Sequence, residues 1–178
     1  MKTLVIVTHP NIENSRINKA WMQALQNEST VTIHQLYNAY PDFKIDVAKE
    51  QELLMEHDRI VLQFPFYWYS SPSLLKEWFD VVLSYGWAYG EGGDKLRGKE
   101  LGLAVSTFGP EQSYQHSGYN RYTMEELLKP FQATSNLIGT KFMTPYILNG
   151  VMHVNDEELA RSTTDYVKFV TTQTVTVS

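Results

Sequence analysis

Residues 60–80 read IVLQFPFYWYSSPSLLKEWFD, and this stretch decides the fold. The apolar run at 60–62 is typical of a buried parallel strand, which lies between two helical layers and need not alternate apolar with polar residues. Pro65 lacks a backbone N–H, so we expect the strand to end there. Ser71 as N-cap and Pro72 in the first turn then predict a helix, which continues through apolar residues at helical spacing up to Val82.

The loop between this strand and helix carries four consecutive aromatic residues, Phe66, Tyr67, Trp68 and Tyr69. Ligands of open α/β sheets bind at the carboxyl ends of the strands, where this loop lies. A flat ligand along the rings is one interpretation. The other interpretation is that the rings pack beneath a neighbouring loop or in a subunit interface. The loop alone does not decide between the two interpretations.

Composition limits the classes of protein to be considered. A chain of 178 residues has the length of one domain, here residues 1–178. The net charge of −5 argues against a nucleic-acid partner. Cysteine is absent, which excludes disulfides and thiolate chemistry. The short apolar run at 3–7 is unlike a signal peptide and no run is long enough to span a bilayer, so we expect a cytoplasmic protein and not an integral membrane protein.

Strand and helix patterns alternate along the whole chain. Strands are predicted at 3–8, 31–36, 60–64, 101–106 and 141–148. Helices are predicted after Ser15 and Ser71, over 46–57, and after the capping boxes that begin at Thr123 and Asn155. This alternation predicts an α/β fold of three layers: a flavodoxin-like, five-stranded parallel sheet in the order 2-1-3-4-5.

The first loop after a strand, residues 8–18, has the character of an anion site. A hydroxyl (Ser15), a guanidinium (Arg16) and an amide (Asn18) stand at the start of a helix, where unpaired N–H groups favour phosphate. The alternative is an ordinary cap by Ser15 with Arg16 at the surface, and His9 alone is more often a loop histidine than a ligand contact.

The fourth strand ends in Ser106, Thr107, Phe108 and Gly109, followed by Tyr114. Small and hydroxyl residues let backbone N–H groups approach a ligand, although a surface turn is the alternative. Strands one, three and four are adjacent in the predicted sheet, so their loops converge. A phosphate at the first loop, a planar ring at the second and backbone contacts from the third describe one flavin mononucleotide (FMN).

Other ligand motifs fail. No G-x-G-x-x-G follows the first strand. Residues 93–100 look like a P-loop, but Glu100 stands where a magnesium-binding hydroxyl is needed, and the segment leads into a strand. The five histidines show no metal-ligand spacing, so we expect no metal site.

The chain resembles the flavodoxin-like NAD(P)H:quinone oxidoreductases, which include DT-diaphorase and the ancillary flavoproteins of bacterial potassium-efflux systems. Its first block matches the pattern H-P-x(4)-S-R-x-N at His9, Pro10, Ser15, Arg16 and Asn18. A second, longer block matches at Phe64, Pro65, Trp68, Tyr69, Pro72, Leu75, Lys76, Trp78, Phe79 and Asp80.

The resemblance implies FMN as cofactor rather than the FAD of the longer mammalian relatives, with its phosphate at the first loop, its ring along the second and its pyrimidine side at the third. Tyr114 is the implied catalytic residue. The implied cofactor-binding residues are His9, Ser15, Arg16, Ile17, Asn18, Pro65, Phe66, Tyr67, Trp68, Tyr69, Ser106, Thr107, Phe108 and Gly109. Of the four loop aromatics, Tyr67 is expected to face a partner subunit.

Two departures from the family stand out. Phe108 replaces the first glycine of its Thr-Gly-Gly. The histidine that accompanies the catalytic tyrosine in mammalian members falls near Asn120, while His116 sits too early, so the histidine role stays open.

The implied activity is hydride transfer from NAD(P)H to a quinone in ping-pong order by a homodimer. A regulatory flavin-bearing subunit, associated peripherally with a potassium-efflux transporter, is one alternative. A flavodoxin-type electron carrier is another. The residues identify neither the physiological acceptor nor a preference between NADH and NADPH.

Overall fold

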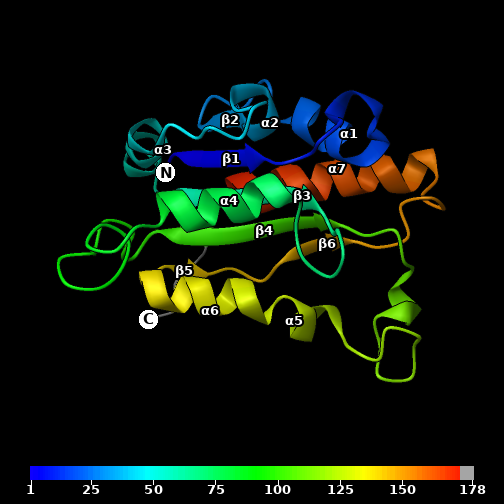
Figure 1. The fold of residues 1–178 in the computed structure, drawn as a ribbon. Helices are drawn as coiled ribbons and strands as arrows, with labels where there is room; N and C mark the ends of the chain where they lie inside the picture. The colour runs from blue at the N-terminus through cyan, green and yellow to red at the C-terminus, as the bar shows by residue number, and fades with distance from the viewer. Residues whose placement is uncertain (173–178) are drawn as a thin grey trace.

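The computed structural model describes residues 1–172. Their strands form a parallel sheet in the order β2-β1-β3-β4-β5 (Figure 1). A sixth strand pairs with β4 beyond β5, so that β5 and β6 together fill the fifth position. The predicted order and the parallel pairing are confirmed. The strands are β1 (Thr3–Val7), β2 (Val31–Gln35), β3 (Arg59–Pro65), β4 (Glu100–Ser106), β5 (Lys141–Phe142) and β6 (Tyr146–Leu148).

Helices cover both faces of this sheet, giving the predicted three layers (Figure 1). α1 and α7 lie against one face, and α3, α4 and α6 against the other. The helices are α1 (Arg16–Ala24), α2 (Leu36–Ala39), α3 (Val47–Met55), α4 (Ser73–Val82), α5 (Met124–Leu127), α6 (Lys129–Ile138) and α7 (Asp156–Thr171), with 3-10 turns η1 (Ile12–Asn14) and η2 (Glu111–Ser113).

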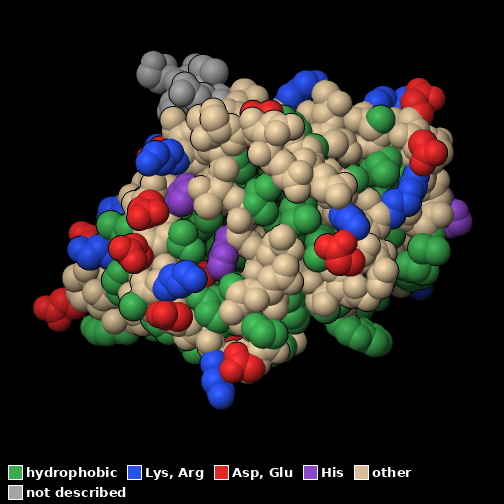
Figure 2. Space-filling view, turned by 90° about the horizontal axis from the view of Figure 1, so that it is seen from above, with side chains coloured by type: hydrophobic (Ala, Val, Ile, Leu, Met, Phe, Trp, Pro, Cys, Tyr) green, Lys and Arg blue, Asp and Glu red, His purple; other side chains and the backbone are tan. Residues whose placement is uncertain are grey.

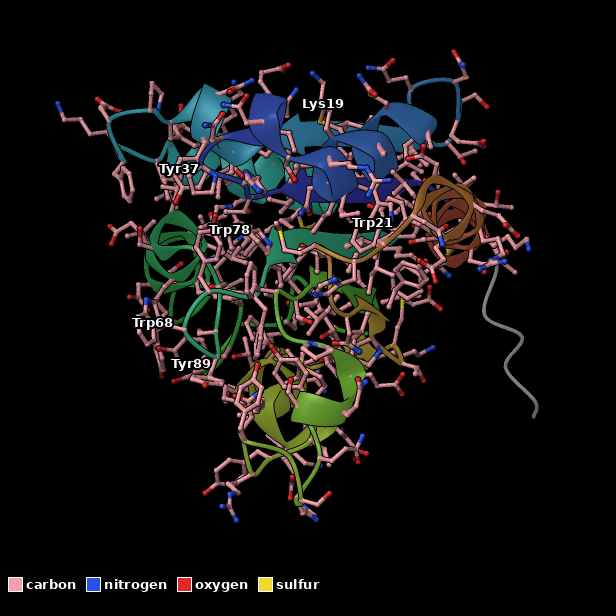
Figure 3. All side chains as sticks on the ribbon, turned by 90° about the vertical axis from the view of Figure 1, so that its right-hand side faces the viewer. Lys19, Trp21, Tyr37, Trp68, Trp78 and Tyr89 are labelled. Carbon is pink, nitrogen blue, oxygen red and sulfur yellow. The ribbon has the colours of Figure 1, made fainter. Side chains whose placement is uncertain are left out.

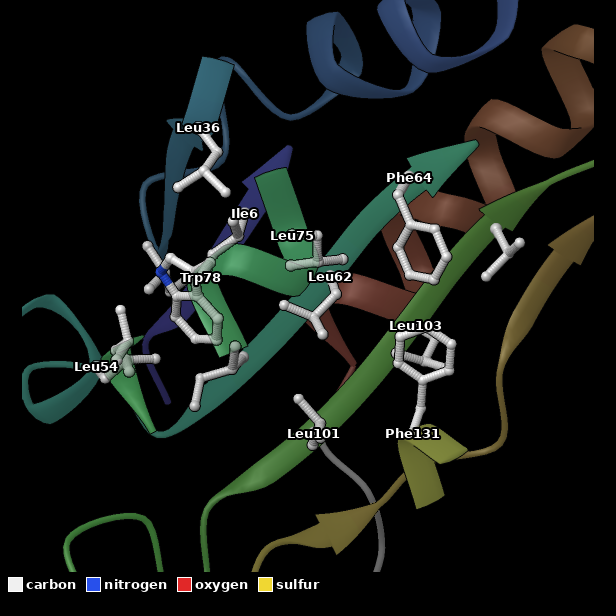
Figure 4. Close-up of a cluster of buried hydrophobic side chains, with 14 of the residues drawn as sticks. Ile6, Leu36, Leu54, Leu62, Phe64, Leu75, Trp78, Leu101, Leu103 and Phe131 are labelled. Atoms are coloured by element: carbon white, nitrogen blue, oxygen red, sulfur yellow. The ribbon is translucent and has the colours of Figure 1, made fainter. Parts of the chain in front are cut away.

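The central strands are buried on both faces, which explains their unbroken apolar sequences. Successive side chains of a strand point to opposite faces. Leu4 and Ile6 of β1 therefore join the core beneath α4, whereas Val5 and Val7 join the core beneath α1 and α7. Figure 4 shows the first core, in which Trp78 of α4 lies over the sheet.

Strand β3 ends at Pro65 as predicted, but the start of α4 is displaced by one position. Pro72 occupies the N-cap and the helix begins at Ser73, so the expectation that Ser71 caps it is wrong. Pro72 has the extended backbone of a cap residue, and its carbonyl accepts the first bond, from the N–H of Leu75. The Ser71 hydroxyl instead lies 3.4 Å from the Pro72 carbonyl oxygen.

The remaining elements follow the prediction with local differences. Both capping boxes form, at Thr123 with Glu126 and at Asn155 with Glu158. The fifth strand is interrupted between β5 and β6, where Pro145 can donate no ladder hydrogen bond. Residues 36–39, expected as strand end and connector, form the one-turn α2, and α1 ends at Ala24 rather than near residue 28.

The surface mixes both signs of charge. Lys and Arg side chains alternate with Asp and Glu over the face seen in Figure 2. Within residues 1–172 no helix is long and apolar enough to cross a membrane. The same residues contain no group of three or more His, Asp or Glu side chains placed to hold a metal ion.

Candidate cofactor-binding site

A cavity of about 560 Å³ opens at the carboxyl ends of β1, β3 and β4, the end of the sheet that faces the viewer in Figure 3. The three predicted loops all contribute to it. Its lining residues are His9, Asn11, Asn14, Ser15, Arg16, Ile17, Asn18, Pro65, Phe66, Tyr67, Ser106, Phe108, Val151 and Met152.

The first loop presents the N-terminus of α1 to this cavity. The hydroxyl of Ser15 caps the helix by accepting the N–H of Asn18 at 3.2 Å. Arg16 and Ile17 occupy the first turn, where backbone N–H groups have no acceptor within the helix. These groups and the helix dipole make the start of α1 a candidate anion site.

Arg16 lines the cavity, and its guanidinium also contacts the start of α7. Its guanidinium donates to the carbonyl oxygen of Val154 and, at 2.6 Å, to a carboxylate oxygen of Asp156 at the start of α7. The Arg16 side chain therefore ties α1 to α7, and its charge is paired.

His9 supplies a neutral donor at the cavity wall. Its Nδ1 accepts the backbone N–H of Asn11 at 3.1 Å, so the proton of the neutral ring sits on Nε2. Burial lowers the pKa of His9, which favours this neutral form.

The aromatic loop divides into two parts. Phe66 and Tyr67 line the cavity, so Tyr67, expected to face a partner, also belongs to the cavity wall. Trp68 and Tyr69 do not line it, and Trp68 is 92% exposed. Figure 3 shows Trp68 at the edge of the molecule.

A tight turn causes this division. The N–H of Ser70 donates to the carbonyl oxygen of Tyr67 at 3.0 Å, and the two central residues, Trp68 and Tyr69, have φ of 48° and 60°. Left-handed φ is uncommon for residues other than glycine, and such strain concentrates at functional sites. The turn rotates the Trp68 side chain into solvent, and only backbone contact with a ligand in the cavity remains open to it.

Asn120, near which the family's histidine is expected, holds the strained turn. Its side-chain oxygen accepts the hydroxyl of Tyr69 at 2.8 Å, and its amide donates to the hydroxyl of Ser113 at 3.2 Å. Asn120 thus bridges the loops after β3 and β4. His116 lies elsewhere, 2.9 Å from Glu126 and largely exposed.

The loop after β4 accommodates Phe108 by turning its side chain outward, 74% exposed, at the rim of the cavity. The hydroxyl of Thr107 is buried, where it donates to the Gly109 carbonyl and contacts Asn149, both at 2.8 Å. A Cβ on Gly109 would lie 2.8–3.0 Å from the hydroxyls of Ser113, Tyr119 and Tyr114, so a side chain there would have to displace these hydroxyls.

Tyr114 lies behind the cavity wall rather than in it. It is buried, its ring is 6.1 Å from that of Phe66 at an edge-to-face angle of 69°, and its hydroxyl approaches Gly109. Burial raises the pKa of Tyr114, so the phenol keeps its proton at neutral pH.

Four lining residues were not predicted. Asn11 and Asn14 lie in the first loop between His9 and Ser15. Val151 and Met152 follow β6, where the N–H groups of Gly150 and Val151 donate to carbonyls of Gly109 and Thr107. Loops that follow adjacent parallel strands converge, and the fifth predicted strand is adjacent to the fourth. The loop after that strand could therefore have been expected at the cavity, which would have identified Val151 and Met152.

The residues present fit FMN. The candidate anion site, the neutral His9 and the aromatic residues Phe66 and Tyr67 in the lining suit a phosphate and a ring system. The buried hydroxyl of Thr8, directly after β1, has no hydrogen-bond partner among the described residues. The cavity is also within the size range of cofactor sites.

Known relatives share this architecture. YdeQ of Bacillus subtilis, described as an uncharacterized NAD(P)H oxidoreductase, is 53% identical over 96% of this chain and 87% of its own. KefG of Cronobacter sakazakii, an ancillary protein of a glutathione-regulated potassium-efflux system, is 43% identical over 89% of this chain and 86% of its own.

Among solved structures, general stress protein 14 of Treponema denticola in complex with FMN is 41% identical, with a TM-score of 0.91 over 96% of this chain and 98% of that one. An NADPH-quinone reductase of P. pentosaceus is 34% identical, with a TM-score of 0.90 over 98% and 100%. A chain described as a thermophilic tryptophan halogenase from Streptomycin violaceusniger is 51% identical, with a TM-score of 0.94 over 96% and 99%.

A family model described as a flavodoxin-like fold matches residues 1–170, nearly the whole chain. Together with these relatives, this match shows that the chain belongs to the flavodoxin-like family that includes the NAD(P)H oxidoreductases and the KefG ancillary proteins.

Proposed function

We propose that the protein is an FMN-dependent NAD(P)H:quinone oxidoreductase. The observation that carries the proposal is the convergence of an anion site, an aromatic wall and a hydroxyl-rich loop on one cavity. The FMN-bound relative and the relatives named as NAD(P)H oxidoreductase and quinone reductase support it. Bound FMN would take a hydride from NAD(P)H and pass it to a quinone, the two substrates using the same face in ping-pong order.

The chain's own residues bind and orient in this proposal. The N–H groups of Arg16 and Ile17 hold the phosphate, and His9 donates from Nε2. Phe66 and Tyr67 flank the ring, with backbone groups of residues 65–69 and 106–109 along its edge. Tyr114, protonated at neutral pH, would donate a hydrogen bond to the quinone oxygen, which requires its hydroxyl to turn from Gly109 into the cavity.

The test is a visible spectrum of the purified protein reconstituted with FMN, followed by stepwise addition of NADPH or NADH and then of menadione. We expect a flavin spectrum that bleaches with the nicotinamide and returns with the quinone. Protein that takes up no FMN, or that leaves both nicotinamides unoxidised in the presence of menadione, contradicts the proposal.

A homodimer is part of the proposal. Trp68, Tyr67 and Tyr85 are large exposed aromatics. Beside the Trp68 turn, a second cavity of about 350 Å³ lies between α4 and α6, with Ser70, Ser71 and Tyr89 in its wall. Exposed apolar surface of this kind marks interaction sites. Sedimentation of only a 20.5 kDa species at micromolar concentration would contradict the dimer.

A transporter-associated role is the second candidate, favoured by the KefG relative. A regulatory subunit can retain quinone reductase activity, so turnover does not separate the two roles. Copurification of the protein with a potassium-efflux transporter from membranes of its source would support the second role. The proposed setting for both is the cytoplasm, where NAD(P)H is available.

The halogenase name is not carried over to this chain. The curated relative YdeQ, similar over nearly the whole chain and with slightly higher identity, bears the name of an NAD(P)H oxidoreductase instead.

A further inference from the structure

A continuous chain of buried polar groups runs from helix α7 to the cavity. It begins at Tyr166 of α7, passes through Gln63 of β3 and Asn18 of α1, and ends at Ser106 of β4. None of these four side chains is more than 5% exposed. Only Asn18 and Ser106 line the cavity, so Tyr166 and Gln63 act from behind it.

Each bond of this chain has a defined direction. The amide nitrogen of Gln63 donates to the backbone carbonyl of Asn18 at 2.9 Å. Because a backbone carbonyl can only accept, the nitrogen of Gln63 must face Asn18, and its oxygen must face Tyr166. The Tyr166 hydroxyl therefore donates to that oxygen, at 2.8 Å.

The orientation of the Gln63 amide also determines the orientation of the Asn18 side-chain amide. The Gln63 nitrogen also lies 3.3 Å from the side-chain oxygen of Asn18, which turns the Asn18 amide nitrogen toward Ser106. That nitrogen donates to the Ser106 hydroxyl oxygen at 2.9 Å. The Ser106 proton has no acceptor among the described residues, and the hydroxyl borders the cavity.

We infer that Gln63 and Tyr166 are positioning residues that fix the Ser106 hydroxyl as a hydrogen-bond donor toward the cavity, so that the ligand atom beside Ser106 must be an acceptor. This inference rests on the proposed function for the identity of the ligand, FMN, whose carbonyl, ribityl and phosphate oxygens are all acceptors.

The surroundings of Tyr166 hold its ring in place and keep its hydroxyl protonated. Its ring stacks on Trp21 with centroids 5.0 Å apart and an interplanar angle of 24°. Burial raises the pKa of Tyr166 well above its ordinary value, so the hydroxyl stays protonated and donating. A buried polar chain in which only the terminal Ser106 proton awaits a partner is rigid, and a rigid donor loses little entropy when a ligand arrives.

The test is a double-mutant cycle on FMN affinity with Gln63→Met and Ser106→Ala. We expect each single variant to weaken FMN binding about tenfold, the value of one hydrogen bond of about 1.4 kcal/mol. In the Ser106→Ala background, adding Gln63→Met should change the dissociation constant by less than about twofold. An equal loss in both backgrounds would overturn the inference, because Gln63 would then act through packing alone.

Tyr166→Phe keeps the ring and removes only the hydroxyl, so it covers the case in which Gln63→Met fails to fold. We expect a loss of about twofold to fivefold in FMN affinity that again disappears in the Ser106→Ala background. Tyr146→Phe is the matched control, because its hydroxyl bonds to Ser162 in the same aromatic cluster without joining the chain. A loss with the control as large as that with Tyr166→Phe would refute the inference.

A measurement on the apoprotein separates this inference from the proposed function. In NMR spectra without flavin, the side-chain amide protons of Gln63 and Asn18 should exchange slowly, and Tyr166→Phe but not Tyr146→Phe should speed their exchange. Slow exchange in a protein that binds no FMN would support the hydrogen-bonded chain from Tyr166 to Ser106 and contradict the proposed cofactor. Fast exchange in a protein that does bind FMN would contradict the hydrogen-bonded chain alone.

Discussion

Replacement of Glu50 by Gln should destabilise the protein although the two side chains have nearly the same size and shape. The carboxylate of Glu50 is fully buried beneath α4 and accepts three hydrogen bonds. His34 and Tyr40 reach one oxygen, at 2.8 and 2.7 Å, and the indole N–H of Trp78 reaches the other, at 2.9 Å. An amide has only one oxygen, so Glu50→Gln would set an NH₂ group against either the Trp78 indole or the other two donors.

The expected cost follows from these three bonds. Two of them become bonds to a neutral acceptor, and one buried donor loses its acceptor altogether, which together cost about 3 kcal/mol. For a chain of this length that is a fall of about 6–12 °C in melting temperature. Urea unfolding at pH 7, followed by tryptophan fluorescence, measures it. Glu52→Gln, on an exposed position of the same helix, is the matched control and should change stability by less than about 0.5 kcal/mol.

The difference between wild type and Glu50→Gln should also depend on pH. Burial alone would raise the pKa of Glu50, but the hydrogen bonds from His34, Tyr40 and Trp78 lower it overall. A carboxyl whose pKa is lower in the folded state stabilises the fold above its unfolded pKa of about 4.5, and this stabilisation is lost as the pH falls through the folded value. The difference should therefore be full at pH 7 and narrow below about pH 4.5. A cost under about 1 kcal/mol at pH 7, or one that stays constant into acid, would refute the reasoning.

Three further substitutions test other parts of the structure. Arg59→Met should cost about 3–5 kcal/mol in urea unfolding, because Arg59 is buried and pairs with Glu100 at 2.6 Å. Tyr69→Phe should lower kcat/KM for menadione about threefold to tenfold and leave stability nearly unchanged, since it frees the turn from Asn120. Gly93→Ala should lower the melting temperature by several degrees, because its Cβ would stand 2.1 Å from a backbone oxygen, and an unchanged melting curve would contradict that contact.

Most of the fold could be predicted from sequence because its main strands and helices carried their own signals, whereas the one-turn α2 did not. Pro65 ended β3, and the pairs Thr123 with Glu126 and Asn155 with Glu158 set the starts of α5 and α7. Such signals depend on residues within one turn or one strand of each other. They place elements to within a few residues, which suffices for the order 2-1-3-4-5 and for the convergence of three loops.

Other features of the site depend on contacts that no local signal encodes. Arg16 lines the cavity, and its place at a phosphate stays a prediction, but the partners of its guanidinium, Val154 and Asp156, lie about 140 residues away in the sequence. The contact of Trp68 and Tyr69 with the flavin stays a prediction, and the two left-handed φ angles that keep these residues out of the cavity lining were not foreseen. A turn of that kind normally carries glycine or asparagine, and neither occurs at these positions, so no sequence rule predicts it.

The pairing of Arg16 changes the electrostatics expected of the site. The guanidinium of Arg16 is shared with Asp156, whose side chain is fully exposed, so the N–H groups at the start of α1 and the neutral His9 are the other donors available to an anion. Such donors are fixed by the backbone, and salt screens them less than it screens a mobile cation. The same ion pair connects the first turn of α7 to the first loop, residues 8–18. Tyr166, further along α7, is linked to Ser106 through the buried chain of Gln63 and Asn18. Helix α7 is therefore linked to the candidate site at two places, the first loop and Ser106. Substitutions in α7 should alter cofactor affinity although most of the helix does not contact the cavity.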